Sequence, residues 1–396
     1  MVSQARPLEG IRVVDLTRFV SGAYATMLLA SLGADVIKVE VGDDGDPYRA
    51  QGTAFVGGVS ALFQALNTGK RGISVDLRSE SGLRVMEALL ATADVMVENG
   101  RPGSLRRFGL DAASVRTSHP HLVYGSISGY GQVGPDASLG GFDLTMQAEG
   151  GLMSVTGVAG GEPVKVGVPV LDIGSAVSCA LAVVAALLGR ERHGRAAHVS
   201  SSLLEFAVAT FTSVAPAYLV DGEVPRQMGS HSPTFAPYGA FRARDGYLAI
   251  AGAGSEDLWH RLCTAIAAPQ LRTDTRFATN ADRVRHLPAL IEAIEAVLGR
   301  HDVDDWLARL AQAGVPSAKV RDLAQVLSSA QVAALGQVRE VPMSGGAYRH
   351  IGPPFQVDGV LDYPRAAPDL GEHTDEVLAE LGLDPHGASI TEVPEA

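Results

Sequence analysis

One acidic residue stands where a covalent nucleophile could be held. Asp172 follows a valine-rich run, residues 166–171, and precedes an apolar segment, residues 173–188, that is predicted to be helical. The partial positive charge at a helix N-terminus stabilises an ionised carboxylate, and such a carboxylate can act as a covalent nucleophile. The same position also suits a helix N-cap, which aspartate commonly fills. The pattern leaves both interpretations of Asp172 open.

A second acid, Asp143, lies in a glycine-rich stretch that precedes Asp172. Residues 129–167 hold 11 glycines in 39 positions, out of 45 in the whole chain. Glycine permits tight turns and close backbone approach, and a loop of this length inside a domain is usually functional. Asp143 could cap a short helix near residues 144–149 or support the site around Asp172. Periodicity does not choose between these roles.

Other catalytic and cofactor motifs are incomplete. The first predicted strand is followed by one glycine, Gly22, where a dinucleotide fingerprint needs three, so Glu40 is interpreted as a solvated strand-end charge. A G-x-G-x-x-G run at residues 129–134 is followed by Pro135 rather than by a helix, and we interpret it as accidental. The sequence contains no P-loop, no G-x-S-x-G elbow and no HExxH. It therefore predicts no metal site.

Composition and charge narrow the class of protein. The chain has 396 residues, 46% of them hydrophobic, and a net charge of −12. These values are typical of a globular protein of two or three domains and argue against nucleic-acid binding, which relies on cationic side chains. Two cysteines, Cys179 and Cys263, support neither a disulfide framework nor a thiolate metal site.

The sequence also predicts no signal peptide and no membrane-spanning segment. The first ten residues lack the apolar core of a signal peptide. The apolar run at residues 173–188 has 16 residues, fewer than the about 20 that a membrane span needs. We therefore expect a soluble, cytoplasmic protein with no membrane partner.

Alternating strands and helices indicate how these residues are positioned. Strands are predicted at residues 11–16, 35–40, 72–76, 95–98, 122–127 and 197–200, and helices at 22–32, 81–92, 173–188 (ended by Gly189) and 203–214. Strand–helix–strand units of this length form parallel sheets, so the fold class is α/β with a doubly wound, mostly parallel sheet. A hairpin at residues 238–251 and helices at 256–267, 287–298 and 303–313 predict a smaller α+β domain. We divide the chain into a large domain (1–222), a small domain (223–325) and a segment (326–396) that returns to the large domain, with a last helix at 374–381.

A series of short motifs runs in order along nearly the whole chain. They are residues 8–17, 32–40, 67–77, 94–99 with Arg101-Pro102-Gly103, 129–131, 141–143, 170–174, 245–247, 314–316 and 371–378. Together they resemble the family III CoA-transferases, whose relatives include formyl-CoA transferases, carnitine CoA-transferases and α-methylacyl-CoA racemases.

The resemblance implies a fold, an assembly and a mechanism. Family members are homodimers of interlocked chains, each with a large Rossmann-like domain and a small domain. Their catalytic aspartate stands at the position of Asp172 and attacks an acyl-CoA thioester, which gives an aspartyl–acyl anhydride. CoA then forms an aspartyl thioester, and an acceptor acid takes over the CoA through a second anhydride. Coenzyme A is thus implied as a substrate, with no permanently bound cofactor.

The resemblance also implies a set of CoA contacts. They are Phe19, Val20 and Ser21 after the first strand, Val75 and Arg78 around the end of the third strand, and Asn99, Gly100, Arg107 and Phe142. Cationic side chains such as Arg78 and Arg107 would contact the phosphates of CoA. Ordinary surface charges are the alternative for both arginines.

One departure narrows the implied activity. The related racemases have a histidine at the position of Phe142, and phenylalanine cannot carry a proton. We therefore expect a CoA-transferase that moves CoA from an acyl-CoA donor to a carboxylic acid. The alternatives are an acyl-CoA racemase or epimerase of the same fold and a non-catalytic CoA-binding subunit of a heteromeric transferase. The presence of Asp172 argues against the subunit.

Overall fold

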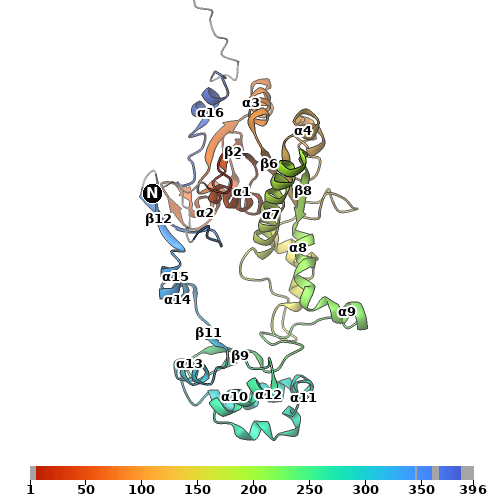
Figure 1. Cartoon of the computed structure of the whole chain (residues 1–396), viewed down its shortest axis with the longest axis vertical. Coiled ribbons are helices and arrows are strands. Elements are labelled where there is room, and N and C mark those ends of the chain that lie inside the picture. Colours follow the sequence, from red (N-terminus) through yellow and green to blue (C-terminus); the bar gives the residue numbers. More distant parts are fainter. Residues whose placement is uncertain (1–5, 344–345, 359–364, 385–396) are drawn as a thin grey trace, which may run out of the picture. The chain divides into compact units, whose positions relative to one another are not determined.

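Six parallel strands form the largest sheet in the computed structural model, which describes residues 6–343, 346–358 and 365–384 (Figure 1). The strands are β1 (Arg12–Leu16), β2 (Asp35–Val41), β5 (Arg71–Val75), β6 (Val95–Glu98), β7 (Val123–Ser128) and β8 (His198–Ser202). They lie in the order β5-β2-β1-β6-β7-β8, and each neighbouring pair is parallel. The predicted parallel α/β sheet is confirmed.

The order of the strands changes direction between β1 and β6. β2 and β5 extend the sheet to one side of this point, and β7 and β8 extend it to the other. In open parallel sheets, ligands bind at the carboxyl ends of the strands where the order reverses. The segments that follow β1 and β6, residues 17–21 and 99–100, therefore lie where a site is expected.

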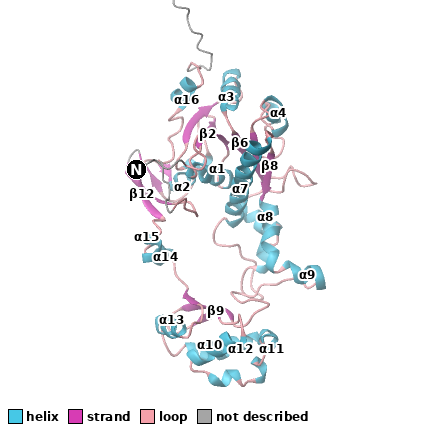
Figure 2. Ribbon diagram, in the orientation of Figure 1, coloured by secondary structure: helices cyan, strands magenta, loops and turns pink. Residues whose placement is uncertain are grey.

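Helices cover the sheet (Figure 2), and apolar side chains of the helices and strands are buried between them. Helices α3 (Glu80–Thr92), α4 (Ala112–Ser118) and α16 (Thr374–Glu380) share one apolar cluster with β1, β2, β5, β6 and β7. In α3, Val85, Met86, Leu89 and Leu90 are the buried side chains, and their spacing of three to four residues gives the helix one apolar face. Helices α1 (Ser21–Ser31) and α7 (Val170–His193) pack against each other, and α7 also contacts β7 and β8.

The long helix α7 differs from its prediction at the C-terminal end. Gly189 lies inside the helix, and Gly194 ends it, with a φ of 67° and its N–H bonded to the carbonyl of Arg190 at 2.7 Å. The helix has 24 residues. By length and composition it is able to cross a membrane, and 39% of its most apolar window is buried inside the protein. The helix is therefore longer than the predicted run of 16 residues, and its length does not exclude a membrane span.

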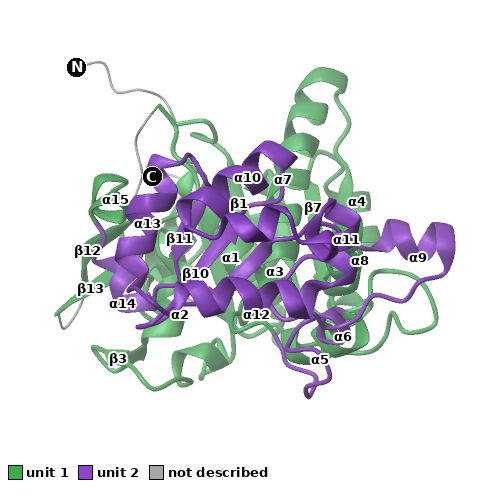
Figure 3. Ribbon diagram, turned by 90° about the horizontal axis from the view of Figure 1, so that it is seen from below, with its two compact units in different colours: residues 1–151, 166–213, 330–396 green, residues 152–165, 214–329 purple. Residues whose placement is uncertain are grey.

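Backbone contacts divide the chain into two compact units, shown in green and purple in Figure 3. The first holds residues 1–151, 166–213 and 330–396, and the second holds 152–165 and 214–329. Gln227 explains why the segment 152–165 belongs to the second unit, because its Nε2 donates to the carbonyls of Thr156 (2.9 Å) and Glu162 (3.2 Å). The sequence-based division had left this segment within residues 1–222.

The second unit has its own sheet and core. Strands β9 (Tyr238–Arg242) and β10 (Tyr247–Ala251) form the predicted hairpin, and β11 (Ser317–Lys319) adds an antiparallel third strand. Trp259 of α10 (Glu256–Ala265) and Trp306 of α13 (Val303–Gln312) are buried in its apolar cluster.

Shorter elements complete the description of the two units. They are η1 (Pro47–Arg49), β3 (Phe55–Val56), β4 (Val59–Ser60), α2 (Ala61–Asn67), η2 (Arg106–Phe108), α5 (Asp143–Glu149), α6 (Leu152–Val155), α8 (Leu203–Thr210), η3 (Phe211–Ser213), α9 (Ala215–Asp221), η4 (Pro269–Arg272), η5 (Thr275–Phe277), α11 (Asn280–Arg285), α12 (Leu287–Leu298), α14 (Leu323–Leu327), α15 (Ala330–Ala334), β12 (Val338–Met343) and β13 (Gly346–Ile351). No helix begins directly after residues 129–134, so the G-x-G-x-x-G run is a loop, as predicted.

Candidate active site

Asp172 is the third residue of α7 and does not cap the helix. The N-cap position is held by Pro169, which makes no side-chain cap bond. Burial raises the pKa of the Asp172 carboxyl to about 7, and the negative charge of Asp143 adds to this rise. A hydrogen bond from the Ser21 hydroxyl partly offsets it. Asp172 is thus a partly desolvated carboxylate at the start of a helix, the state in which a carboxylate is a reactive nucleophile.

Asp143 supplies the cap that Pro169 lacks. Its Oδ1 accepts the backbone N–H groups of Leu171 (2.8 Å) and Asp172 (3.2 Å). Its Oδ2 accepts a hydrogen bond from Gln147, one turn along α5. Asp143 thereby satisfies two amides at the start of α7 and fixes the backbone of Asp172. The two roles left open for Asp143 resolve in favour of supporting Asp172, because the helix it caps is α7 and not its own.

A cavity of about 530 Å³, which we call the Asp172 cavity, opens beside this carboxylate. Its lining residues are Arg18, Phe19, Val20, Ser21, Tyr48, Gln51, Asn99, Gly100, Arg101, Ile127, Ser128, Gly129, Leu139, Gly140, Gly141, Phe142, Asp172 and Leu203. Phe19 packs edge-on against both Tyr48 and Phe142, with ring centroids 5.6 and 5.9 Å apart. The cavity therefore has an aromatic wall close to the candidate nucleophile.

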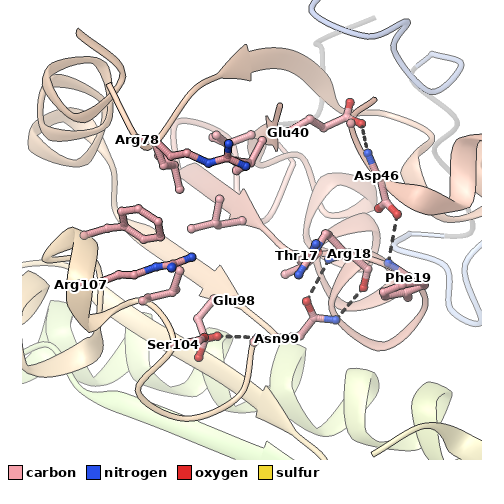
Figure 4. A pocket seen from close by; sticks show the side chains of 18 residues that line it. Thr17, Arg18, Phe19, Glu40, Asp46, Arg78, Glu98, Asn99, Ser104 and Arg107 are labelled. Atoms are coloured by element: carbon pink, nitrogen blue, oxygen red, sulfur yellow. Dashed lines mark hydrogen bonds between the residues drawn. The ribbon is translucent and has the colours of Figure 1, made fainter. Parts of the chain in front are cut away.

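A second cavity of about 370 Å³, the arginine cavity, lies at the ends of β1, β2 and β6. Figure 4 shows that the side chains of Arg78 and Arg107 both point into it. The guanidinium of Arg107 lies over the ring of Phe108, 4.6 Å from its centroid. Arg18 lines this cavity as well, and three guanidinium groups in one cavity suit a ligand that carries phosphates.

The two cavities adjoin within the first unit. Arg18, Phe19, Asn99 and Gly100 line both of them. The structure thus brings together eight of the nine predicted CoA contacts: Phe19, Asn99 and Gly100 in both cavities, Arg78 and Arg107 in the arginine cavity, and Val20, Ser21 and Phe142 beside Asp172. Val75 lines neither cavity and is buried at the end of β5, whereas Leu77 and Arg78 line the arginine cavity.

Side chains from neighbouring strands hold the backbone between the two cavities. Asn99 accepts the N–H of Arg18 at 2.9 Å and donates to the Arg18 carbonyl at 2.6 Å. Asp15 accepts the N–H of Thr17 at 3.0 Å. A bidentate clamp of this kind fixes a loop whose peptide groups would otherwise bond to water.

A buried ion pair holds the next residue of the same loop, Phe19. Phe19 has a φ of 61°, the left-handed region that costs a non-glycine residue about 1 kcal/mol or more. Its N–H donates to Asp46 at 3.4 Å. Asp46 also bonds the ammonium group of Lys38 at 3.0 Å, and Lys38 donates to the carbonyl of Thr17 at 3.0 Å. Both side chains of this pair are fully buried. Hydrogen bonds to this buried ion pair therefore hold the strained loop in place.

Glu40 anchors the loop that carries Asp46, and its interpretation as a solvated charge was wrong. Its carboxylate accepts two hydrogen bonds from the guanidinium of Arg49 (2.8 and 2.6 Å) and one from the N–H of Asp46 (2.8 Å). Arg49 in turn lies over the ring of Phe63, 3.8 Å from its centroid. Glu40 is 2% exposed. Strand periodicity could not reveal this, because Arg49 reaches Glu40 from the irregular segment after β2.

Glu98, the last residue of β6, is a buried acid that directly precedes Asn99 and Gly100, two of the residues that line both cavities. Burial raises the pKa of its carboxyl to about 7, although hydrogen bonds from the Ser126 hydroxyl and the Gly100 N–H lower it. The Gly100 N–H donates to Glu98 Oε2 at 2.7 Å. Glu98 therefore orients the amide of one of the predicted CoA contacts.

Several lining residues of the Asp172 cavity were not predicted as site residues, among them Arg18, Tyr48, Gln51 and Arg101. Arg101 belongs to one quoted motif and Arg18 directly follows another, which was the signal available for these two residues. Within the residues that the structure describes, no group of three or more metal-binding side chains occurs. His119 instead lies 3.2 Å from Glu87.

Comparisons with known proteins agree on one family. A sequence model described as CoA-transferase family III matches residues 8–374. The chain is 36% identical over 378 residues to succinyl-CoA:glutarate CoA-transferase of Mus musculus, across 95% of this chain and 86% of that one. It is 34% identical over 357 residues to acetyl-CoA:oxalate CoA-transferase of Acetobacter aceti, across 90% of each. The crystal structure of a CAIB/BAIF family protein from Brucella suis has a TM-score of 0.84 and 36% identity, covering 96% of this chain and 100% of that chain.

Proposed function

This chain belongs to the family III CoA-transferases, and from that membership and the setting of Asp172 we propose that it moves CoA from an acyl-CoA donor to a dicarboxylic acid. The relatives named for glutarate and for oxalate support a dicarboxylic acceptor. The observation that carries the proposal is a desolvated carboxyl group, Asp172, in a cavity that adjoins a second cavity lined by three arginines.

Binding of CoA follows from the two adjoining cavities. The phosphates of the nucleotide lie by Arg78 and Arg107, since guanidinium groups bind phosphate oxygens in pairs. The pantetheine arm passes Phe19 and Asn99, which line both cavities, and so brings the thioester to Asp172.

The first half of the reaction transfers the acyl group and then the CoA to the protein. A carboxylate oxygen of Asp172 attacks the thioester carbonyl, the C–S bond breaks, and CoA leaves as a thiolate. The product is an anhydride between Asp172 and the acyl group. The thiolate then attacks the aspartyl carbonyl of this anhydride and releases the donor carboxylate, which leaves CoA attached to Asp172 as a thioester.

The second half runs the same bonds in reverse with the acceptor. An acceptor carboxylate attacks the aspartyl thioester and expels CoA thiolate, which forms a new anhydride. The thiolate attacks the acceptor's carbonyl, and Asp172 is regenerated as a carboxylate. Each attack produces an oxyanion, and the N–H groups at the start of α1, next to Val20 and Ser21, are suited to stabilise it.

The experiment that tests this mechanism is a search for the protein-bound intermediate. Wild-type protein incubated with succinyl-CoA and quenched in acid should gain the mass of CoA, with the adduct on the peptide that contains Asp172. Asp172→Ala and Asp172→Asn should show no adduct and lose at least about 1,000-fold in transfer rate. Asp136→Asn, an exposed acid in the glycine-rich loop, is the matched control. Near-normal transfer by Asp172→Ala would rule out the mechanism.

Racemisation makes a different prediction at the same site. It needs a group that carries a proton to the substrate's α-carbon, and Phe142 cannot do so. In deuterated water without an acceptor acid, we expect no deuterium at the α-carbon of a 2-methylacyl-CoA. Rapid exchange would favour a racemase.

A further inference from the structure

Arg101 places a cation in the Asp172 cavity, against a glycine. It follows β6 and lines the cavity together with Gly140. A Cβ added to Gly140 would lie 3.0 Å from both Nε and Nη2 of Arg101. The guanidinium therefore lies against the backbone of Gly140 at the wall of the cavity, and Arg101 is exposed to solvent.

The Arg101 guanidinium has no ionic partner among residues 6–343, 346–358 and 365–384. Other arginines of the first unit are paired, for example Arg12 with Asp35, Arg49 with Glu40 and Arg190 with Asp94. Among the residues that the structure describes, none forms an ion pair or a side-chain hydrogen bond with the Arg101 guanidinium, and Asp172 does not either.

The position of Arg101 separates it from the path of CoA. Arg18 is also unpaired among the described residues, but it lines both cavities and so lies along the route from the nucleotide to the thioester. Arg101 lines the Asp172 cavity and not the arginine cavity. It therefore lies in a part of the site that the arginine cavity does not reach.

Charge balance during the reaction indicates what Arg101 binds. Of the described residues that line the Asp172 cavity, Arg18 and Arg101 are charged at neutral pH, and Asp172, whose pKa is about 7, is partly ionised. When Asp172 becomes an anhydride or a thioester, its negative charge is lost and the two cations remain. A dicarboxylic acid keeps one carboxylate after the other has reacted, and that group supplies the missing negative charge.

We propose that Arg101 binds the unreacting carboxylate of the dicarboxylic substrate and thereby selects dicarboxylic over monocarboxylic acids. The inference rests on the proposed function, since it names the residue that sets acceptor choice in CoA transfer. A guanidinium binds a carboxylate through two parallel hydrogen bonds, which a methyl group at the same position cannot replace. Arg101 is thus a specificity-determining residue, whereas Asp172 carries the chemistry.

The test measures preference between acids of equal length. With acetyl-CoA as donor, whose acyl group has no second carboxylate, kcat/KM is measured for succinate against butyrate and for glutarate against pentanoate. Arg101→Gln should lower kcat/KM about 10- to 100-fold for the two dicarboxylates and change it less than about threefold for the monocarboxylates. Arg101→Lys, which keeps the charge without the planar fork, should lose an intermediate amount. The KM for acetyl-CoA should not change in either variant.

Arg106→Gln is the matched control, because Arg106 is an exposed arginine nearby that lines neither cavity. Its acid preference should equal that of wild type. Equal losses by Arg101→Gln on both classes of acid, or a raised KM for acetyl-CoA, would overturn the role of Arg101 while leaving CoA transfer intact. If the wild-type protein transfers CoA to no acid, the proposed function fails, and the inference fails with it.

Discussion

At the scale of single residues, the burial that makes the Asp172 carboxylate reactive also lowers the stability of the folded protein. Burial and the charge of Asp143 raise its pKa from the ordinary 3.8 to about 7. Folding therefore disfavours the ionised form, which is the form that attacks a thioester. The cost of this charge is absent below about pH 4, grows as the pH rises toward 7 and is constant above that.

We expect Asp172→Asn to be more stable than wild type at neutral and alkaline pH. The amide keeps an oxygen for the Ser21 hydroxyl and removes the desolvated charge, which accounts for at most roughly 4 kcal/mol. Thermal unfolding at pH 8 and pH 5 checks this: the gain in Tm should be larger at pH 8. An equal shift at both values would show that ionisation is not the cause.

The same pKa predicts how the rate depends on pH. In the proposed mechanism the carboxylate of Asp172 is the nucleophile, so kcat/KM for acyl-CoA should fall as the pH drops through about 7. Asp143→Asn keeps an oxygen for the amides of Leu171 and Asp172 but removes the neighbouring charge. This acid limb should therefore move to lower pH in Asp143→Asn, whereas Asp136→Asn should leave it in place. An unmoved limb in Asp143→Asn would show that Asp143 acts through geometry alone.

Sequence reasoning reached Asp172 only in part from its own pattern. The start of an apolar helix suggested either a cap or a nucleophile, and resemblance to a family selected the nucleophile. The actual cap, Asp143, lies 29 residues earlier and reaches Asp172 by a tertiary contact. No periodicity carries that information. Arg101 and Tyr48 were missed for the same reason, since loops bring them into the cavity.

At the scale of elements, the site depends on the loops that follow β1 and β2. The loop after β1 holds Phe19 in a strained conformation and is bound by Asn99 and Asp46. The loop after β2 supplies Asp46 and is itself bound by Glu40. Catalytic positioning therefore rests on buried charges outside the cavity that contains Asp172.

Removal of Asp46 should destabilise this arrangement. Asp46→Ala leaves the ammonium group of Lys38 fully buried without its carboxylate, and breaking such a pair typically costs about 3–5 kcal/mol. Urea unfolding should show this loss, and at low temperature the folded variant should bind acyl-CoA more weakly, because the N–H of Phe19 loses its acceptor. Asp44→Ala, at an exposed neighbour, should change stability by less than about 0.5 kcal/mol. A loss of stability without any change in the KM for acyl-CoA would separate the ion pair from the site.

Elements with strong patterns were predictable and those made by tertiary pairing were not. The six strands of the main sheet are short runs between turns, with β1, β2 and β6 rich in valine, and each was predicted to within two residues. The hairpin of β12 and β13 was missed because its strands alternate polar and apolar residues irregularly, and only Val341 and His350 of it are buried. The end of α7 was misplaced because Gly189, which usually marks a helix end, here lies within the helix.

At the scale of the whole molecule, α7 exposes an apolar stripe. Val177, Leu181 and Leu188 are 41, 70 and 50% exposed. Their spacing of four and seven residues places them on one face of the helix. Val208 of α8, a helix that packs against α7, is 62% exposed. An exposed apolar patch of this kind marks a surface that another molecule covers.

We expect a second copy of this chain to cover the apolar stripe of α7. The family resemblance implies a homodimer, and an apolar helix face left in water would be costly. Light scattering after gel filtration should give about twice the chain mass of 41.2 kDa. Leu181→Asp should shift the protein toward the monomer, because dimerisation would then desolvate a charge, whereas Glu191→Gln on the same helix should not.

A membrane is the competing explanation, because α7 is long and apolar enough to span one. Recovery of wild-type protein in the membrane fraction, or a single-chain mass at micromolar concentration, would contradict the dimer.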